Sequence, residues 1–272
     1  MKKTVLITGA SRGIGKAAAL RFAKESANTC HFNEDNCGKD GCDAHICDKK
    51  THDADSYNLV ITCNKNTQML EDVKNAVTSF GCPCLAYTGD LSSSSNVKQL
   101  AGLTAKEFGS VDILINNAGV SYVGLLTDMS DNDWNNIINT NLSSVFYCCR
   151  EFVPSMVRNK SGCIINISSI WGSLGASCEV AYSASKGAVN AFTRALAKEL
   201  APSSVSVNAV ACGLIDTDMN SVFSADELVS ICEDIPCGRA GTPDEAAGLI
   251  YSVSRQTPYM TGQIITIDGG WS

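Results

Sequence analysis

A tyrosine and a lysine four positions apart, Tyr182 and Lys186, have types and spacing that can do chemistry. The surrounding pattern is helical, so the two side chains share one helix face and can meet at one ligand. A phenol has a pKa of about 10, and a nearby ammonium favours its ionised form, which brings the pKa closer to neutrality. We therefore expect Tyr182 to act as a general acid toward a carbonyl oxygen.

A serine shortly after the apolar run Cys163–Ile167, Ser169, can serve the same reaction. Its hydroxyl can donate a hydrogen bond to the carbonyl oxygen and stabilise the charge that develops there. A Tyr–Lys pair alone also occurs by chance on helix surfaces, where it has no chemical role. Further motifs along the chain argue against that alternative.

A glycine-rich turn near the start of the chain, Thr8–Gly15, leads from an apolar run into a helical segment. Glycines tolerate positive φ and let the backbone approach a pyrophosphate, while the helix N-terminus offers free N–H groups. A tight turn without a ligand is the alternative. The glycine-rich turn follows the first expected strand of a chain in which strands and helices alternate, and this position favours a phosphate site.

The elements that position these residues alternate between short apolar runs and longer segments of helical period. This pattern predicts an α/β fold, with one doubly wound Rossmann-type domain over residues 1–272 and a seven-stranded parallel sheet. The expected strands are Thr4–Thr8, Asn58–Cys63, Cys84–Thr88, Val111–Ile115, Cys163–Ile167, Val205–Val210 and Ile264–Ile267. The expected helices are Gly13–Ala27, Thr67–Phe80, Ser94–Phe108, Asp131–Arg158, Val180–Ala201 and Asp244–Arg255.

Two more motifs fall in order along the chain, Asn116–Gly119 after the fourth strand and Asn141 in a long helix. With the glycine turn, Ser169 and the Tyr182–Lys186 pair, the chain resembles the short-chain dehydrogenases/reductases. The resemblance implies that Lys186 also holds the nicotinamide ribose. It further implies that Asn141 anchors a water chain that returns a proton to Tyr182.

The same resemblance implies a set of cofactor contacts. Asp90 is similar to a residue that contacts adenine, although a loop carboxylate that caps the next helix is the alternative reading. Thr217 is similar to a residue that contacts the nicotinamide amide, in a loop where Cys212 stands in place of the usual proline. The expected cofactor-binding residues are Gly9, Ser11, Arg12, Gly13, Ile14, Gly15, Asn64, Lys65, Asp90, Leu91, Asn117, Ala118, Gly119, Tyr182, Lys186, Gly213, Ile215 and Thr217.

The end of the second strand indicates which nicotinamide cofactor is bound. NAD-specific relatives carry an acidic residue there for the ribose 2′-hydroxyl, whereas this chain has Asn64 and Lys65. Lys65 and Arg12 can pair with a 2′-phosphate through charge-assisted hydrogen bonds. We therefore predict NADP(H), the alternative for Lys65 being a solvated loop charge.

Within the family the chain is similar to 3-oxoacyl-carrier-protein reductases, and more closely to the branch that reduces a 5-aminopentanone group on elongation factor P. The segments Trp171–Tyr182, Cys212–Gly213 and Asp268–Trp271 carry that closer resemblance. It implies a protein-borne ketone with an amine as substrate, and the family implies a homotetramer. Glu179 can pair with the substrate ammonium, unless it is only a solvated loop acid. An NAD(P)-dependent sugar or alcohol dehydrogenase and a non-catalytic NADPH-binding regulator stay open as alternatives.

Composition excludes several classes of partner. The net charge of −7 gives no basic footprint for nucleic acid. No stretch approaches the roughly 20 apolar residues that span a bilayer, and no signal peptide is evident. We therefore expect a cytoplasmic protein, with no membrane partner, whose 14 cysteines are reduced.

A segment at about 30–57 interrupts the alternation between the first helix and the second strand. It holds seven acidic residues against three lysines, together with four cysteines and all three histidines of the chain. A zinc site built from Cys37, Cys42, His45 and Cys47 is one interpretation. Their spacing matches no known zinc pattern, and an acidic, loosely ordered or disordered insertion is the alternative that we favour.

Overall fold

The computed structural model of the protein describes residues 2–30 and 56–272. The candidate zinc ligands Cys37, Cys42, His45 and Cys47 lie outside these ranges. Among the described residues, no group of His, Cys, Asp and Glu side chains is arranged to hold a metal ion. The ten cysteines whose side chains are described form no disulfide. None of the helices in the described ranges combines the length and the apolar character needed to span a membrane.

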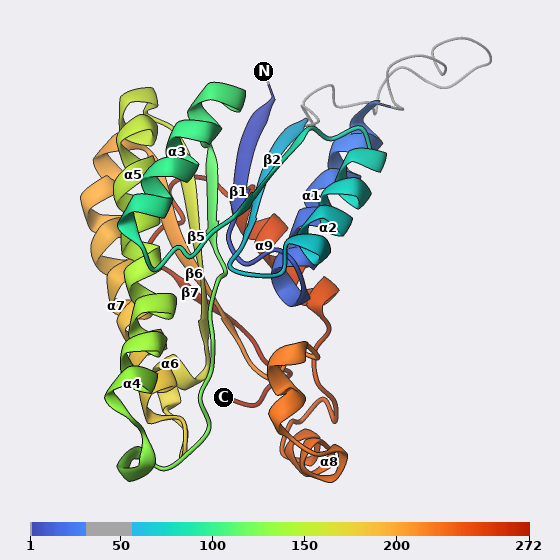
Figure 1. Ribbon diagram of the computed structural model, residues 1–272, viewed down its shortest axis with the longest axis vertical. Helices are drawn as coiled ribbons and strands as arrows, with labels where there is room; N and C mark the ends of the chain where they lie inside the picture. Colours follow the sequence, from blue (N-terminus) through green and yellow to red (C-terminus); the bar gives the residue numbers. More distant parts are fainter. Residues whose placement is uncertain (1, 31–55) are drawn as a thin grey trace, which may run out of the picture.

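A seven-stranded parallel sheet forms the centre of the domain, as the sequence predicts (Figure 1). Its spatial order is β3-β2-β1-β4-β5-β6-β7. The bounds are β1 Lys3–Ile7, β2 Tyr57–Cys63, β3 Cys84–Thr88, β4 Ile113–Asn116, β5 Gly162–Ser169, β6 Val205–Cys212 and β7 Ile264–Ile267. The strand order reverses between β1 and β4, and such a switch point opens a ligand-binding crevice at the carboxyl ends of the strands.

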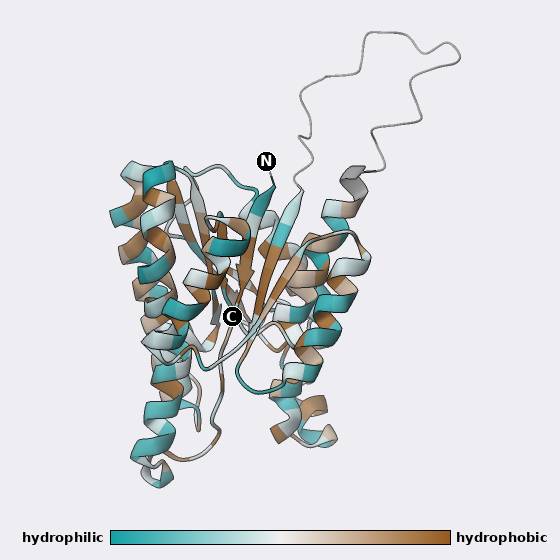
Figure 2. Cartoon of the chain, turned by 45° about the horizontal axis from the view of Figure 1, so that its top comes forward, coloured by the Kyte–Doolittle hydropathy of each residue, from teal (hydrophilic) through white to brown (hydrophobic). Residues whose placement is uncertain are grey.

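Helices cover both faces of the sheet because the strands are apolar on both sides (Figure 2). One face is covered by α1 Gly13–Cys30, α2 Thr67–Ser79 and α9 Pro243–Ser254 (Figure 1). The other face is covered by α3 Ser94–Phe108, α5 Ser144–Asn159 and α7 Val180–Leu200. A buried hydrophobic cluster fills each interface. The two layers hold the carboxyl ends of the strands in fixed relative positions.

The helix expected over Asp131–Arg158 is divided in the structure. It consists of α4 Asp131–Ile138, a π-helical turn η2 Asn139–Ser143 and then α5. Asn141 lies in the π turn and is buried. Single π turns within α-helices are frequent at functional sites. The prediction of one regular helix was therefore wrong at the position of a candidate catalytic residue.

Two projections extend past the carboxyl ends of the strands, at the bottom of Figure 1. The α4 arm, residues 121–138, contains η1 Leu126–Asp128 and α4. The α8 arm, residues 217–233, contains η4 Asp218–Val222 and α8 Ala225–Glu233. Sequence reasoning missed α8, together with the short elements η1, η4, α6 Trp171–Leu174 and η3 Ala201–Ser203. A capping box at Ser224 and Glu227 marks the start of α8 and is the signal that could have revealed it.

Candidate active site

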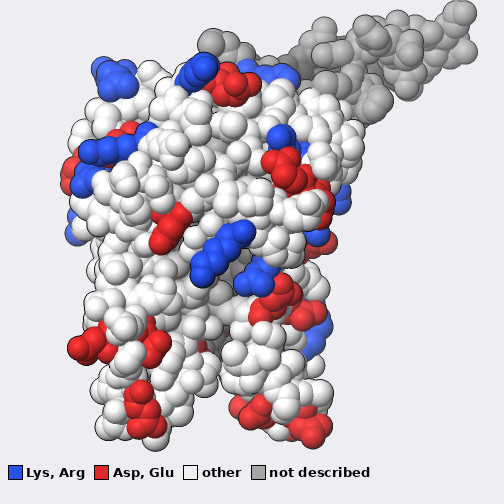
Figure 3. All heavy atoms as spheres, viewed as in Figure 1, with Lys and Arg blue, Asp and Glu red and all other residues white. Residues whose placement is uncertain are grey.

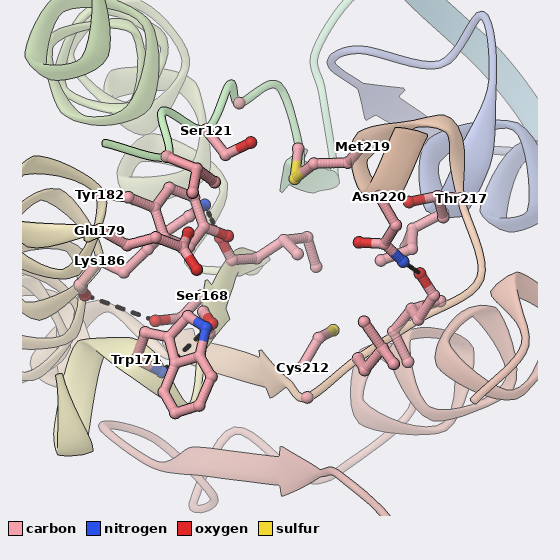
Figure 4. Close-up of a pocket in the computed structure, with 18 of the residues that line it drawn as sticks. Ser121, Ser168, Trp171, Glu179, Tyr182, Lys186, Cys212, Thr217, Met219 and Asn220 are labelled. Carbon is pink, nitrogen blue, oxygen red and sulfur yellow. Dashed lines mark hydrogen bonds between the residues drawn. The ribbon is translucent and has the colours of Figure 1, made fainter. Parts of the chain in front are cut away.

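A cleft lies at the carboxyl ends of the strands, between the two arms. It has a volume of about 150 Å³ and opens to solvent on one side. Figure 4 shows polar side chains from α7 and β5 on one side of it and residues of the α8 arm on the other. Of the residues proposed from sequence, the cleft brings together Ile14, Asn117, Gly119, Ser169, Glu179, Tyr182, Lys186, Gly213, Ile215 and Thr217.

The proposed catalytic side chains converge in this cleft from two elements. Ser169 is the last residue of β5, and Tyr182 and Lys186 lie in the first two turns of α7. All three are buried, with relative exposures of 6%, 9% and 5%. The Nζ of Lys186 lies 5.6 Å from the ring centroid of Tyr182 and donates a 2.8 Å hydrogen bond to the carbonyl of Ile167. Tyr182 and Lys186 thus lie close together, as their spacing on one helix predicts, while the catalytic roles of the three residues stay predictions.

The electrostatics of Tyr182 differ from the sequence expectation. Burial raises its pKa above the ordinary value, and Cys212 and Glu179 raise it further, while a hydrogen bond with Ser169 acts in the opposite direction. The expectation that Lys186 brings the phenol toward neutral pKa was therefore wrong for this structure, because burial is the larger effect. Since a raised pKa keeps the phenol protonated at neutral pH, Tyr182 is in the state that a proton donor needs.

Burial has the opposite effect on Lys186. It lowers the pKa of the ammonium from 10.5 to about 8, because the low-dielectric surroundings disfavour the charged form. Burial also raises the pKa of Cys212, at the end of β6, to about 12. The site thus holds a neutral phenol and a neutral thiol around a lysine that titrates near pH 8.

The glycine-rich turn is held against the loop after β4. The Asn117 amide donates to the carbonyls of Thr8 and Gly9 at 2.9 and 3.0 Å. Gly9 has φ of +67°, and a Cβ there would lie 2.9 Å from the Cα of Ala118. A Cβ on Gly13, with φ of +54°, would lie 3.3 Å from the Thr217 methyl. Because its glycines lack side chains, the turn exposes backbone at the N-terminus of α1, and such an arrangement fits the pyrophosphate of a dinucleotide.

Asn141 is fixed beside the catalytic pair. Its side-chain oxygen accepts from the Val120 N–H at 2.8 Å, and its amide donates to the Val120 carbonyl and to Ser185 Oγ at 2.9 and 3.0 Å. A Cβ on Gly119 would lie 3.4 Å from Asn141 Oδ1 and 3.5 Å from Lys186 Nζ. Asn141 therefore closes the wall behind Lys186, and its part in a water chain stays a prediction.

The remaining proposed cofactor contacts lie along the same edge of the sheet, outside the cleft lining. Asn64 and Lys65 are exposed directly after β2. Asp90, after β3, accepts a 2.9 Å hydrogen bond from the Ser92 N–H, so it organises the loop before α3. The other members are Ser11, Arg12, Gly15, Ala118 and the buried Leu91. The adenine contact of Asp90 stays a prediction.

Much of the cleft wall was not predicted from sequence. Met219, Val222, Phe223 and Ile231 line it from the α8 arm. Asn220 fixes the start of that arm by donating a 2.7 Å hydrogen bond to the Ile215 carbonyl. Ser121 and Val123 of the α4 arm and Leu214 also belong to the lining. So do Trp171 and Trp271, whose rings meet edge to face with their centroids 5.0 Å apart. Trp171 and Trp271 belong to the segments that carry the closer resemblance, but no motif marks the apolar residues of the α8 arm, because apolar lining residues have no fixed spacing.

Comparisons with known proteins agree with this geometry. A family model described as enoyl-(acyl carrier protein) reductase matches residues 49–272. The uncharacterized oxidoreductase YmfI of Bacillus subtilis is 36% identical over 273 residues, covering 100% of this chain and 99% of its own. The 3-oxoacyl-[acyl-carrier-protein] reductase FabG of Staphylococcus epidermidis is 33% identical, covering 99% of this chain and 99% of its own. FabG of Chlamydia pneumoniae is also 33% identical, covering 98% of this chain and 96% of its own. The chain therefore belongs to the short-chain dehydrogenase/reductase family, whose members bind a nicotinamide cofactor and act as oxidoreductases on CH–OH or C=O groups.

Proposed function

We propose that the protein is an NADPH-dependent carbonyl reductase whose substrate is a protein-borne ketone with an amine, the 5-aminopentanone group of elongation factor P. The observation that carries the reductase assignment is the convergence of Ser169, Tyr182 and Lys186 in one cleft beside the glycine cradle. A non-catalytic cofactor-binding protein has no need of that set. Likeness to the 3-oxoacyl-[acyl-carrier-protein] reductases supports a 3-oxo thioester as the second candidate substrate.

The side chains of the cleft have distinct parts in this reaction. NADPH, when bound, supplies the hydride to the carbonyl carbon. Tyr182 transfers its phenolic proton to the carbonyl oxygen, and Ser169 donates a hydrogen bond to the same oxygen. Lys186 holds the nicotinamide ribose, and the backbone of Gly9–Gly15 holds the pyrophosphate. The apolar walls from the α8 arm exclude water from the reacting carbonyl.

The residue types at the end of β2 support NADPH as the cofactor. No carboxylate stands there to bind a 2′-hydroxyl or to repel a 2′-phosphate. Within the described ranges Lys65 has no ion pair, and it lies two residues before the N-terminus of α2. Arg12 is paired at 3.3 Å with Asp218, in an exposed contact that a 2′-phosphate can replace. A free cation at a helix N-terminus suits a dianionic group.

Oxidation of NADPH with a panel of ketones tests the assignment. We expect turnover of a ketone in the panel, which includes acetoacetyl thioester, modified elongation factor P and simple keto sugars, with a crotonyl thioester as the C=C control. We expect kcat/KM to be at least about tenfold higher with NADPH than with NADH. Lys65→Ala should reduce that preference, whereas Lys106→Ala, an exposed lysine on α3, should not. Equal use of both cofactors contradicts the NADPH assignment, and no oxidation with any ketone contradicts the reductase assignment.

Glu179 supports an ammonium on the substrate. Its carboxylate is partly buried at the cleft beside Tyr182, and the part of the chain that the structure describes offers it no ion pair (Figure 4). Burial raises the pKa of this carboxyl. A cationic substrate group at this position would compensate the buried negative charge.

Glu179→Gln should separate the two candidate substrates. We expect KM for an amino-ketone to rise by roughly tenfold, because one charge-assisted contact is lost, while kcat/KM for a neutral acetoacetyl thioester stays within about twofold. Steady-state kinetics with both substrates measures this, and Glu199→Gln, at an exposed glutamate of α7, is the matched control. Equal changes with both substrates contradict an ammonium contact, and the 3-oxo thioester then becomes the favoured substrate.

A further inference from the structure

Both arms beside the cleft carry large apolar side chains that are exposed to solvent. On the α4 arm, which also exposes Trp134, they include Val123, Leu125 and Leu126, with relative exposures of 43%, 59% and 57%. On the α8 arm they are Met219, Val222 and Val229, with exposures of 40%, 60% and 59%. We call these six residues the apolar rim. Val123, Met219 and Val222 also line the cleft, so the rim continues the reaction site outward.

The charged side chains of the two arms themselves are all acidic. The chain has no Lys or Arg between Lys106 and Arg150 or between Lys198 and Arg239, and these two stretches include both arms. Acidic side chains occupy them instead, and Figure 3 shows acidic groups without basic ones at the tips of both arms on the face in view. On the α4 arm they are Asp128, Asp131 and Asp133, and on the α8 arm Asp226, Glu227, Glu233 and Asp218, the last of which pairs with Arg12.

Side-chain contacts leave two acids at the starts of the arm helices available to a partner. Asp133 and Glu227 are engaged in capping boxes with Ser130 and Ser224. Asp131 and Asp226 are exposed at the first and second positions of their helices and have no ion pair with any described residue. An apolar surface with unpaired charges of one sign suits a partner with an apolar contact and charges of the opposite sign.

We propose that the apolar rim and the acids beside it are the docking surface for a basic protein segment that carries the ketone. The segment lies across both arms and extends its keto side chain into the cleft. This inference rests on the proposed ketone reduction and adds the chemistry of the carrier to it. An acidic carrier would meet charges of its own sign at the mouth and is disfavoured.

Two synthetic peptides with the same levulinyl-lysine side chain test the proposal, one flanked by leucines and arginines and the other by leucines and glutamates. We expect kcat/KM to be about tenfold higher for the basic peptide at about 0.01 M salt, where the Debye length is about 30 Å. The difference should shrink at 0.15 M, where the Debye length is about 8 Å. The double variant Asp131→Asn/Asp226→Asn should lose the preference. Asp72→Asn/Glu107→Gln, remote from the arms, should retain it.

The apolar contribution is tested with Leu125→Ser/Val229→Ser against Leu103→Ser on α3. We expect the rim variant to lower kcat/KM several-fold for the basic peptide and to leave free levulinate unchanged, because the reacting groups are intact. Equal rates with both peptides overturn the docking surface while the reductase assignment stands. If neither peptide, free levulinate nor any ketone of the panel above oxidises NADPH, the reductase assignment is overturned instead. A change of sedimentation coefficient in the rim variant assigns the rim to a second copy of the chain and also overturns the proposal.

Discussion

Replacing Tyr182 with Phe should lower kcat for ketone reduction by roughly 10³-fold, because general acid catalysis contributes about 10²–10⁴ and the hydroxyl is the proton donor. The ring is buried, with a relative exposure of 9%, so Phe preserves its packing. Only the hydroxyl and its hydrogen bond with Ser169 are lost. Steady-state NADPH oxidation gives kcat, and fluorescence titration gives the Kd for NADPH, which should change by less than about threefold.

Tyr122→Phe is the matched control for this substitution. Tyr122 lies in the α4 arm between Ser121 and Val123, which both line the cleft, whereas Tyr122 does not. We expect kcat of the control to stay within about twofold of the unmodified protein, since no reacting group is removed. If Tyr182→Phe retains more than about a tenth of the activity, another group must donate the proton and the assignment of the site is wrong.

Local spacing explains why the proximity of Tyr182 and Lys186 could be predicted from sequence. They are one helical turn apart in one element, whereas Ser169 and Asn141 were assigned through the order of motifs that resembles the family. The seven-stranded parallel sheet could also be predicted locally, because continuous apolar runs are typical of strands that helices cover on both faces. These features need no knowledge of which distant segments come together.

What sequence could not provide depends on burial and on long-range packing. The pKa of Tyr182 was expected to fall toward neutrality because of Lys186, but burial raises it. The π turn at Asn141 follows the hydrogen bonds of that residue with Val120 and Ser185, which periodicity does not encode. The α8 arm is a long excursion after β6, and its apolar residues meet the cleft only in the folded chain. Tertiary contacts decide each of these features.

Lys186→Met should lower kcat/KM by roughly 10²-fold and should also remove a pH dependence that the unmodified protein shows. The pKa of Lys186 is about 8, so its ammonium is present below that pH and is lost above it. The rate of ketone reduction by the unmodified protein should therefore fall as pH rises through about 8. The Met variant has no group to titrate there, and its residual rate should be flat across the same interval. If the rate of ketone reduction by the Met variant still falls as pH rises through about 8, the titrating group is not Lys186.

Stability should change with pH in the opposite sense to activity. Because the folded-state pKa of Lys186, about 8, lies below its ordinary value of 10.5, the folded chain binds fewer protons than the unfolded chain between these values. The free energy of unfolding that this group contributes therefore rises across that interval, and below about pH 8 the full penalty of a buried ammonium is present. Urea unfolding should show that the stability of Lys186→Met relative to the unmodified protein decreases between pH 8 and 10.5. The control Lys106→Ala, at an exposed lysine, should show no such trend. If Lys186→Met loses activity but is more stable than the unmodified protein below about pH 8, then Lys186 lowers the free energy of unfolding while it serves the reaction.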